Sequence, residues 1–115
     1  MSARFAVARV AAAVWLTVLT WGSLAPQESV RGAFTFGDVL VHIVGYLGLT
    51  LLLLASQRAP KLMVTGLIAL IIGIVMELLQ MLTSDRSGSV LDVASNAVGA
   101  LIAVAAWRIG SRLTN

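Results

Sequence analysis

Four apolar segments take up most of this 115-residue chain, and they restrict its fold more than any other feature. They cover approximately residues 5–24, 38–55, 61–82 and 90–109, with short polar breaks between them. A helix needs about 20 apolar residues to cross the hydrocarbon core of a bilayer, and each segment is close to that length. Open strands would leave backbone groups unbonded in lipid, so helices are expected. The sequence therefore predicts an all-α fold, a four-helix transmembrane bundle that forms a single domain over residues 1–115.

The composition argues against a soluble or nucleic-acid-binding domain. Hydrophobic residues make up 59% of the chain and charged residues 11%, whereas soluble domains carry about 25% charged residues. The eight lysine and arginine residues are scattered singly rather than in runs. We therefore interpret them as topology signals and expect no nucleic-acid partner. Cysteine is absent, which excludes disulfides and thiol chemistry.

The basic residues predict an orientation in the membrane. With four spans, both termini and the break around Ser56 share one side. That side has no acidic residue and six of the eight basic residues, namely Arg4, Arg9, Arg58, Lys61, Arg108 and Arg112, while Arg31 and Arg86 fall on the other side. Because short cytoplasmic loops are enriched in lysine and arginine, we predict that both termini are cytoplasmic.

The first segment has an alternative interpretation. Arg4 and Arg9, the apolar run around them and the small residues Ser23 and Ala25 also fit a signal peptide with its cleavage site. Cleavage there would leave three spans and put the two ends of the chain on opposite sides of the membrane.

Polar side chains recur at helical spacing inside or at the ends of the other three segments. Asp38, His42 and Tyr46 are four residues apart and share one face of the second segment, while Asp92 and Asn96 are spaced likewise in the fourth. Glu77 and Gln80 share a face near the end of the third. The predicted topology places all of them at the outward end, below the break that carries Arg86. Because ionisable groups are costly in a bilayer, by about 2.5–3.5 kcal/mol near its centre, they commonly mark a working site. The candidate ligand-binding residues are Asp38, His42, Glu77, Gln80, Arg86, Asp92 and Asn96.

Each candidate also has a purely structural interpretation. Asp38 and Asp92 stand at capping-box positions, where a carboxylate in the first turn bonds free backbone N–H groups. Asn96 or His42 could instead hydrogen-bond within the bundle, and Arg86 could simply solvate its loop. These interpretations stay open at the sequence level.

Glu77 lies too deep in its segment to cap its own helix. Its structural alternative is a protonated carboxyl group hydrogen-bonded inside the bundle. Since an apolar residue can replace a buried charge at little net cost, we expect Glu77→Leu to impair function more than stability.

The sequence indicates no metal or cofactor. It contains one histidine and no H-E-x-x-H motif, which is thin support for a metal site. No P-loop, dinucleotide fingerprint or nucleophile elbow is present. Ser84, Ser87 and Ser89 nevertheless remain individual candidates for a catalytic nucleophile. Small residues at regular spacing predict close helix packing instead, at Gly45, Gly48, Ser95, Gly99 and Ala103.

The spaced polar residues resemble the VanZ-like family over roughly residues 34–105. The similarity rests on Asp38 and His42, the Glu77-Leu78-Leu79-Gln80 motif, Arg86, the Asp92-to-Asn96 motif, and Gly99; Tyr46 also fits. The family often has lysine after the first aspartate, where this chain has Val39. The resemblance implies a small bacterial integral membrane protein of the plasma membrane, in a family whose namesake is associated with resistance to the glycopeptide teicoplanin. It supplies no catalytic residues.

Three functions follow as hypotheses. The favoured one is a non-enzymatic envelope protein whose outward-facing polar pocket binds an amphipathic ligand: a lipid headgroup, a cell-wall precursor or a lipoglycopeptide such as teicoplanin. Membrane lipids and a lipid-linked or lipidated ligand are the expected partners. The second is a membrane enzyme acting on a headgroup, with His42 and Glu77 as general acid and base. The third is a small transporter that works as a homo-oligomer.

Overall fold

The computed structural model describes residues 2–25, 38–83 and 89–115 and shows an all-helical chain. The helices are α1 (Ala3–Leu24), α3 (Asp38–Ala55), α4 (Leu62–Thr83) and α5 (Val90–Leu113). The described residues contain no strand. All four helices are long and apolar enough to cross a membrane. The predicted all-α fold, with four helices long and apolar enough to span a membrane, is therefore confirmed.

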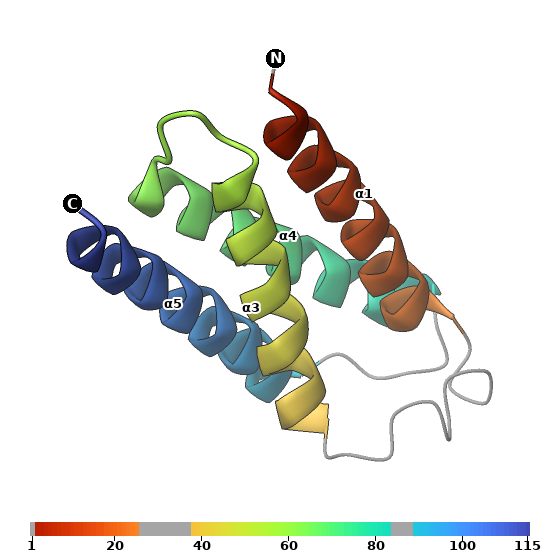
Figure 1. The fold of residues 1–115 in the computed structure, drawn as a ribbon. Coiled ribbons are helices and arrows are strands. Elements are labelled where there is room, and N and C mark those ends of the chain that lie inside the picture. The colour runs from red at the N-terminus through yellow and green to blue at the C-terminus, as the bar shows by residue number, and fades with distance from the viewer. Residues whose placement is uncertain (1, 26–37, 84–88) are drawn as a thin grey trace.

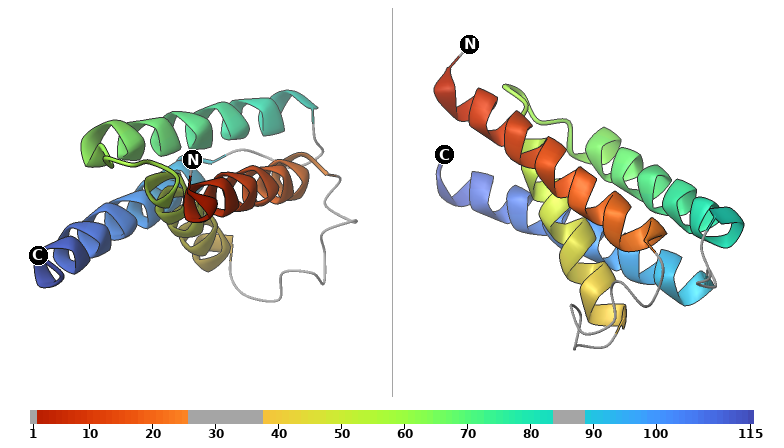
Figure 2. Two further views of the ribbon diagram at one scale, coloured as in Figure 1. Left: turned by 45° about the horizontal axis from the view of Figure 1, so that its top comes forward. Right: turned by 90° about the vertical axis from the view of Figure 1, so that its right-hand side faces the viewer.

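The helices alternate in direction and form an elongated bundle of 47 × 26 × 24 Å (Figure 1). Both termini and the α3–α4 connection lie at one end, called the terminal end below. The opposite end, where α3 and α5 begin and α4 ends, is called the polar end. Helix α3 contacts each of the other helices and packs most extensively on α5. Figure 2 shows that α3 crosses α5 obliquely, so their first turns diverge at the polar end.

Small residues allow the helices to approach closely around α3. A Cβ atom on Gly99 would collide with the backbone carbonyl oxygen of Ile43, and one on Gly48 would collide with the indole ring of Trp15. The Trp15 indole N–H donates a hydrogen bond to the Gly45 carbonyl oxygen at 2.8 Å, which fixes α1 on α3. The close packing predicted from the small residues is confirmed at these glycines.

The outward faces of the helices are apolar. Exposed large side chains recur along α4 and α5, among them Leu67, Ile71, Leu78 and Leu101. A soluble protein rarely exposes an apolar surface of this extent. These faces suit contact with lipid, because the helices bond their own backbone groups internally.

The helix ends follow local chemistry more closely than hydropathy. The Gln57 side chain joins α3 to α4, since its amide N–H donates to Leu53 O and Thr65 Oγ1 while its oxygen accepts from the Lys61 N–H. Helix α5 continues to Leu113, one turn past the predicted end of the apolar segment. Arg112 occupies its last turn, where a cation is favourable. Hydropathy therefore predicts where the apolar span ends, at residue 109, but not where helix α5 itself ends.

Candidate functional site

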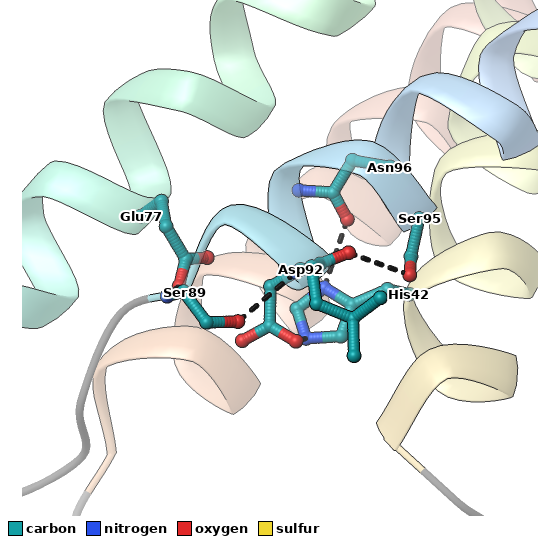
Figure 3. A network of polar contacts seen from close by, with 7 residues as sticks. His42, Glu77, Ser89, Asp92, Ser95 and Asn96 are labelled. Atoms are coloured by element: carbon teal, nitrogen blue, oxygen red, sulfur yellow. Dashed lines mark hydrogen bonds and ion pairs between the residues drawn. The ribbon is translucent and has the colours of Figure 1, made fainter.

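Polar side chains from three helices meet at the polar end of the bundle (Figure 3). His42 comes from the second turn of α3, Glu77 from the last third of α4, and Asp92 and Asn96 from the first two turns of α5. Together with Ser89, which precedes α5, they are called the His42 network below. Their helical spacing puts them on the inner faces of the helices, as the antiparallel topology requires.

His42 lies between an amide and a carboxylate. Its Nδ1 atom is 2.8 Å from Asn96 Oδ1, and its Nε2 atom is 3.5 Å from Asp92 Oδ1. Because an amide oxygen only accepts hydrogen bonds, Nδ1 carries a proton. Nε2 then faces a carboxyl oxygen, a contact that is favourable when one proton lies between the two groups.

The start of α5 shows why Asp92 is available to His42. Ser89 caps the helix, because its hydroxyl oxygen accepts a hydrogen bond from the Asp92 N–H at 3.0 Å. In a complete capping box, Asp92 would accept the Ser89 N–H in return. Here Glu77 Oε1 accepts that N–H at 2.7 Å, from another helix. Glu77 thus completes the cap of α5, and the Asp92 carboxyl group points to His42.

The inner part of the network is shielded from solvent. Glu77 is 6% exposed and Asn96 1%, whereas the His42 and Asp92 side chains keep 15% and 17% of their surface. The Glu77 carboxyl group also lies near the Asp92 and His42 side chains (Figure 3). A ligand can therefore reach His42 and Asp92 first, while Glu77 and Asn96 support them from below.

Tyr46 lies one turn further into the bundle than His42. It is 2% exposed, and its hydroxyl group has no hydrogen-bond partner among the described residues. Gly73 of α4 makes room for this arrangement, since a Cβ atom there would lie 3.2 Å from the Tyr46 ring and 3.0 Å from Asn96 Nδ2. Three helices meet at this point without an intervening side chain from α4.

The structure brings together four of the seven predicted site residues. Gln80 is buried one turn beyond Glu77 and is not among the residues of the His42 network. Asp38 departs from the expected convergence: it is exposed in the first turn of α3 and pairs with no described residue. The reason is the oblique crossing of α3 and α5, which carries the start of α3 away from the network (Figure 2). Arg86 lies outside the described residues.

Sequence reasoning missed the role of the Ser89 N–H, the contribution of Gly73 and the unpaired Tyr46 hydroxyl. The capping-box spacing pointed to Ser89, but no local pattern shows that a residue of another helix accepts its N–H. Among the described residues, no group of three or more acidic, histidine or cysteine side chains is placed to hold a metal ion. The network offers hydrogen-bond acceptors and one imidazole that faces a carboxyl group.

Comparisons with known proteins identify a family. A search of curated proteins and a search of solved structures each gave no match. A family model described as VanZ/LLP1 matches residues 4–111, which is nearly the whole chain and includes α1. The match extends well beyond the polar residues on which the sequence resemblance rests. Four helices of membrane-spanning length and apolarity, together with this match, indicate a membrane protein, and the chain belongs to the VanZ/LLP1 family.

Proposed function

We propose that this protein resides in the bacterial plasma membrane and binds the polar headgroup of an amphipathic ligand at the His42 network. The ligand is a lipid headgroup, a cell-wall precursor or a lipoglycopeptide such as teicoplanin, with its acyl chain held against the apolar helix faces. The observation that carries the proposal is the pairing of His42 with both Asn96 and Asp92 between apolar helices. Ionisable groups in such segments are costly, so they commonly mark a functional site.

The division of roles within the network supports binding. Asp92 and the outer edge of His42 are partly exposed, so they can bond a headgroup. Glu77 and Asn96 are bonded on the inner side, so they position the start of α5 and the imidazole. Gln80, Asp38 and Arg86 remain proposed ligand contacts; Arg86 would attract phosphate or carboxylate.

Binding is tested with purified protein in nanodiscs. The probes are a phosphatidylethanolamine, an undecaprenyl-linked cell-wall precursor and teicoplanin, each titrated while retained ligand is counted by native mass spectrometry. His42→Gln and Asp92→Asn should weaken binding of one probe at least tenfold. Arg112→Gln, which removes an exposed charge at the terminal end, is the control and should bind as the wild type does. Equal affinity of all variants for every probe would contradict the proposal.

A membrane enzyme is the second candidate, and one geometric observation favours it. His42 Nε2 faces Asp92 at 3.5 Å, an arrangement in which a carboxyl group can orient an imidazole for proton transfer. The pairing gives His42 and Asp92 the leading roles, because Glu77 Oε1 is engaged with the Ser89 N–H. Product formed from one of the same probes by the wild type, and lost in His42→Gln, would favour catalysis. Flux into sealed vesicles would instead favour the oligomeric transporter.

The orientation is a separate part of the proposal. The excess of basic residues at the terminal end supports a cytoplasmic location for that end and an external one for the His42 network. Reporters fused after Asn115 or inserted near Arg58 should report a cytoplasmic location, and one inserted near Gly88 an external one. An external Asn115 would overturn this placement.

A further inference from the structure

A second candidate site lies at the terminal end, independent of the His42 network. A groove of about 240 Å³ is bounded by α1, α3 and α4. Arg9 and Ser56 supply its polar lining, and the rest is apolar, with Ala13, Leu16, Leu49 and Ile72 among the lining residues. The groove is smaller than the roughly 300–1,000 Å³ of typical small-molecule clefts, so it suits one stretch of acyl chain.

Arginine side chains from separate parts of the sequence gather beside this groove. The Arg4 guanidinium lies 4.6 Å from the centre of the Phe5 ring, and that of Arg58 lies 6.0 Å from it. Phe5 and Arg9 are one turn apart on α1, and Arg9 Nε donates a 3.4 Å hydrogen bond to the Ser56 carbonyl oxygen. Arg4, Arg9 and Arg58 are called the cationic cluster below.

The described acidic side chains lie toward the other end of the bundle from this cluster. The acidic residues that the structure describes, Asp38, Glu77 and Asp92, all lie in the polar-end halves of their helices. A topology signal requires only that basic residues lie on one side of the membrane. It does not require Arg4 and Arg58, 54 positions apart, to share one phenyl ring beside an apolar groove.

We propose that the groove and the cationic cluster bind an anionic phospholipid of the surrounding bilayer. One acyl chain lies along the apolar lining, and the phosphate group meets the cationic cluster. Charge complementarity selects the headgroup, since each arginine near a membrane surface favours anionic lipid. The site serves as a lipid anchor at the terminal end, and its function does not depend on what the His42 network binds.

The test uses the full chain in nanodiscs of equal phosphatidylglycerol and phosphatidylcholine. The protein is released into mild detergent, and retained lipids are counted by native mass spectrometry. The wild type should retain phosphatidylglycerol in excess. Arg9→Gln should lower that excess about fivefold, Arg9→Lys should preserve most of it, and Arg112→Gln is the control that removes the same charge from α5.

The apolar half is tested by filling the groove. Ala13 is exposed on the groove side of α1, so Ala13→Trp should displace either lipid without disturbing the core. Val14→Trp, also exposed but absent from the groove lining, should retain lipid as the wild type does. Circular dichroism checks that each variant is folded. Retained lipid in the nanodisc ratio, an unchanged Ala13→Trp variant, or a lipid-free dimer that covers the groove would overturn the proposal.

Discussion

The two ends of this bundle hold polar and charged side chains in different ways. At the polar end, Glu77 and Asn96 are buried and bonded across helices, to the Ser89 N–H and to His42. At the terminal end, the Arg4 and Arg58 side chains are exposed and flank the Phe5 ring. A buried polar group depends on its partner, because water cannot replace it. An exposed cation keeps water or lipid phosphate as partners. Substitutions should therefore affect stability strongly at the polar end and weakly at the terminal end.

The largest effect is expected where backbones touch beneath the His42 network. Gly99→Ala should destabilise the bundle by about 3 kcal/mol or more, because its Cβ would meet the Ile43 carbonyl oxygen and backbone cannot move aside. Denaturant-induced unfolding in mixed micelles measures this cost. Gly110→Ala, in the same helix with nothing within 4 Å of an added Cβ, is the control and should be neutral or stabilising. Equal behaviour of the two variants would refute the close α3–α5 contact.

Loss of the Asn96 side chain should have the next largest effect. Asn96→Leu leaves His42 Nδ1 without its acceptor and should lower the free energy of unfolding by about 1–3 kcal/mol. Asp38→Asn, an exposed position at the same end, should change stability by less than about 0.5 kcal/mol. The same unfolding assay compares them. If Asn96→Leu costs no more than Asp38→Asn, the His42–Asn96 hydrogen bond contributes little to the fold.

Glu77 should show a smaller but selective effect. From burial alone, Glu77→Leu is expected to change stability little. The hydrogen bond from the Ser89 N–H changes that expectation, because Glu77→Leu removes the acceptor that completes the α5 cap. We expect a loss of about 1 kcal/mol, the usual value of a helix cap. Glu77→Gln retains a side-chain oxygen and should recover most of it. Identical unfolding of the two variants would indicate that Glu77 does not cap α5.

The smallest effect is expected at the terminal end. Arg58→Gln removes one exposed guanidinium from the Phe5 ring and should cost about 0.5–1 kcal/mol at most. Added salt should reduce this difference, since exposed charges are screened. Unfolding measured at low and high salt provides the test. A salt-independent loss as large as that of Asn96→Leu would remove the distinction between the two ends.

Much of the fold could be predicted because lipid leaves few alternatives. The length and apolarity of four segments gave the helix number, and the small residues gave the close contacts at Gly48 and Gly99. Helix periodicity and antiparallel topology also anticipated that His42, Glu77, Asp92 and Asn96 would approach one another. Crossing angles are set by packing details that hydropathy does not contain. For that reason Asp38 was expected with the others and lies apart.

Features that depend on tertiary contacts could not be predicted. The spacing of Ser89 and Asp92 indicates a capping box, but only the structure shows Glu77 accepting the Ser89 N–H from another helix. Likewise, the spacing that puts Tyr46 on one face with His42 does not show that its hydroxyl group lacks a hydrogen-bond partner among the described residues. A local pattern shows which backbone groups at a helix end need a hydrogen-bond partner. Only the packing of the neighbouring helix shows which side chain supplies it.

The central claim, that α3, α4 and α5 meet at the His42 network, is most directly tested by cross-linking. The natural chain has no cysteine, so the two introduced thiols of each double variant are the only ones that can react. Three double variants are compared with short thiol reagents: His42→Cys with Asp92→Cys, Glu77→Cys with Asp92→Cys, and Leu53→Cys with Asp92→Cys. Leu53 is the control, since it lies about 16 Å further along α3 than His42. The structure predicts that the first two pairs cross-link within a monomer and that the control does not. Absence of intramolecular cross-links in the first two pairs, or cross-links only between copies, would contradict the account.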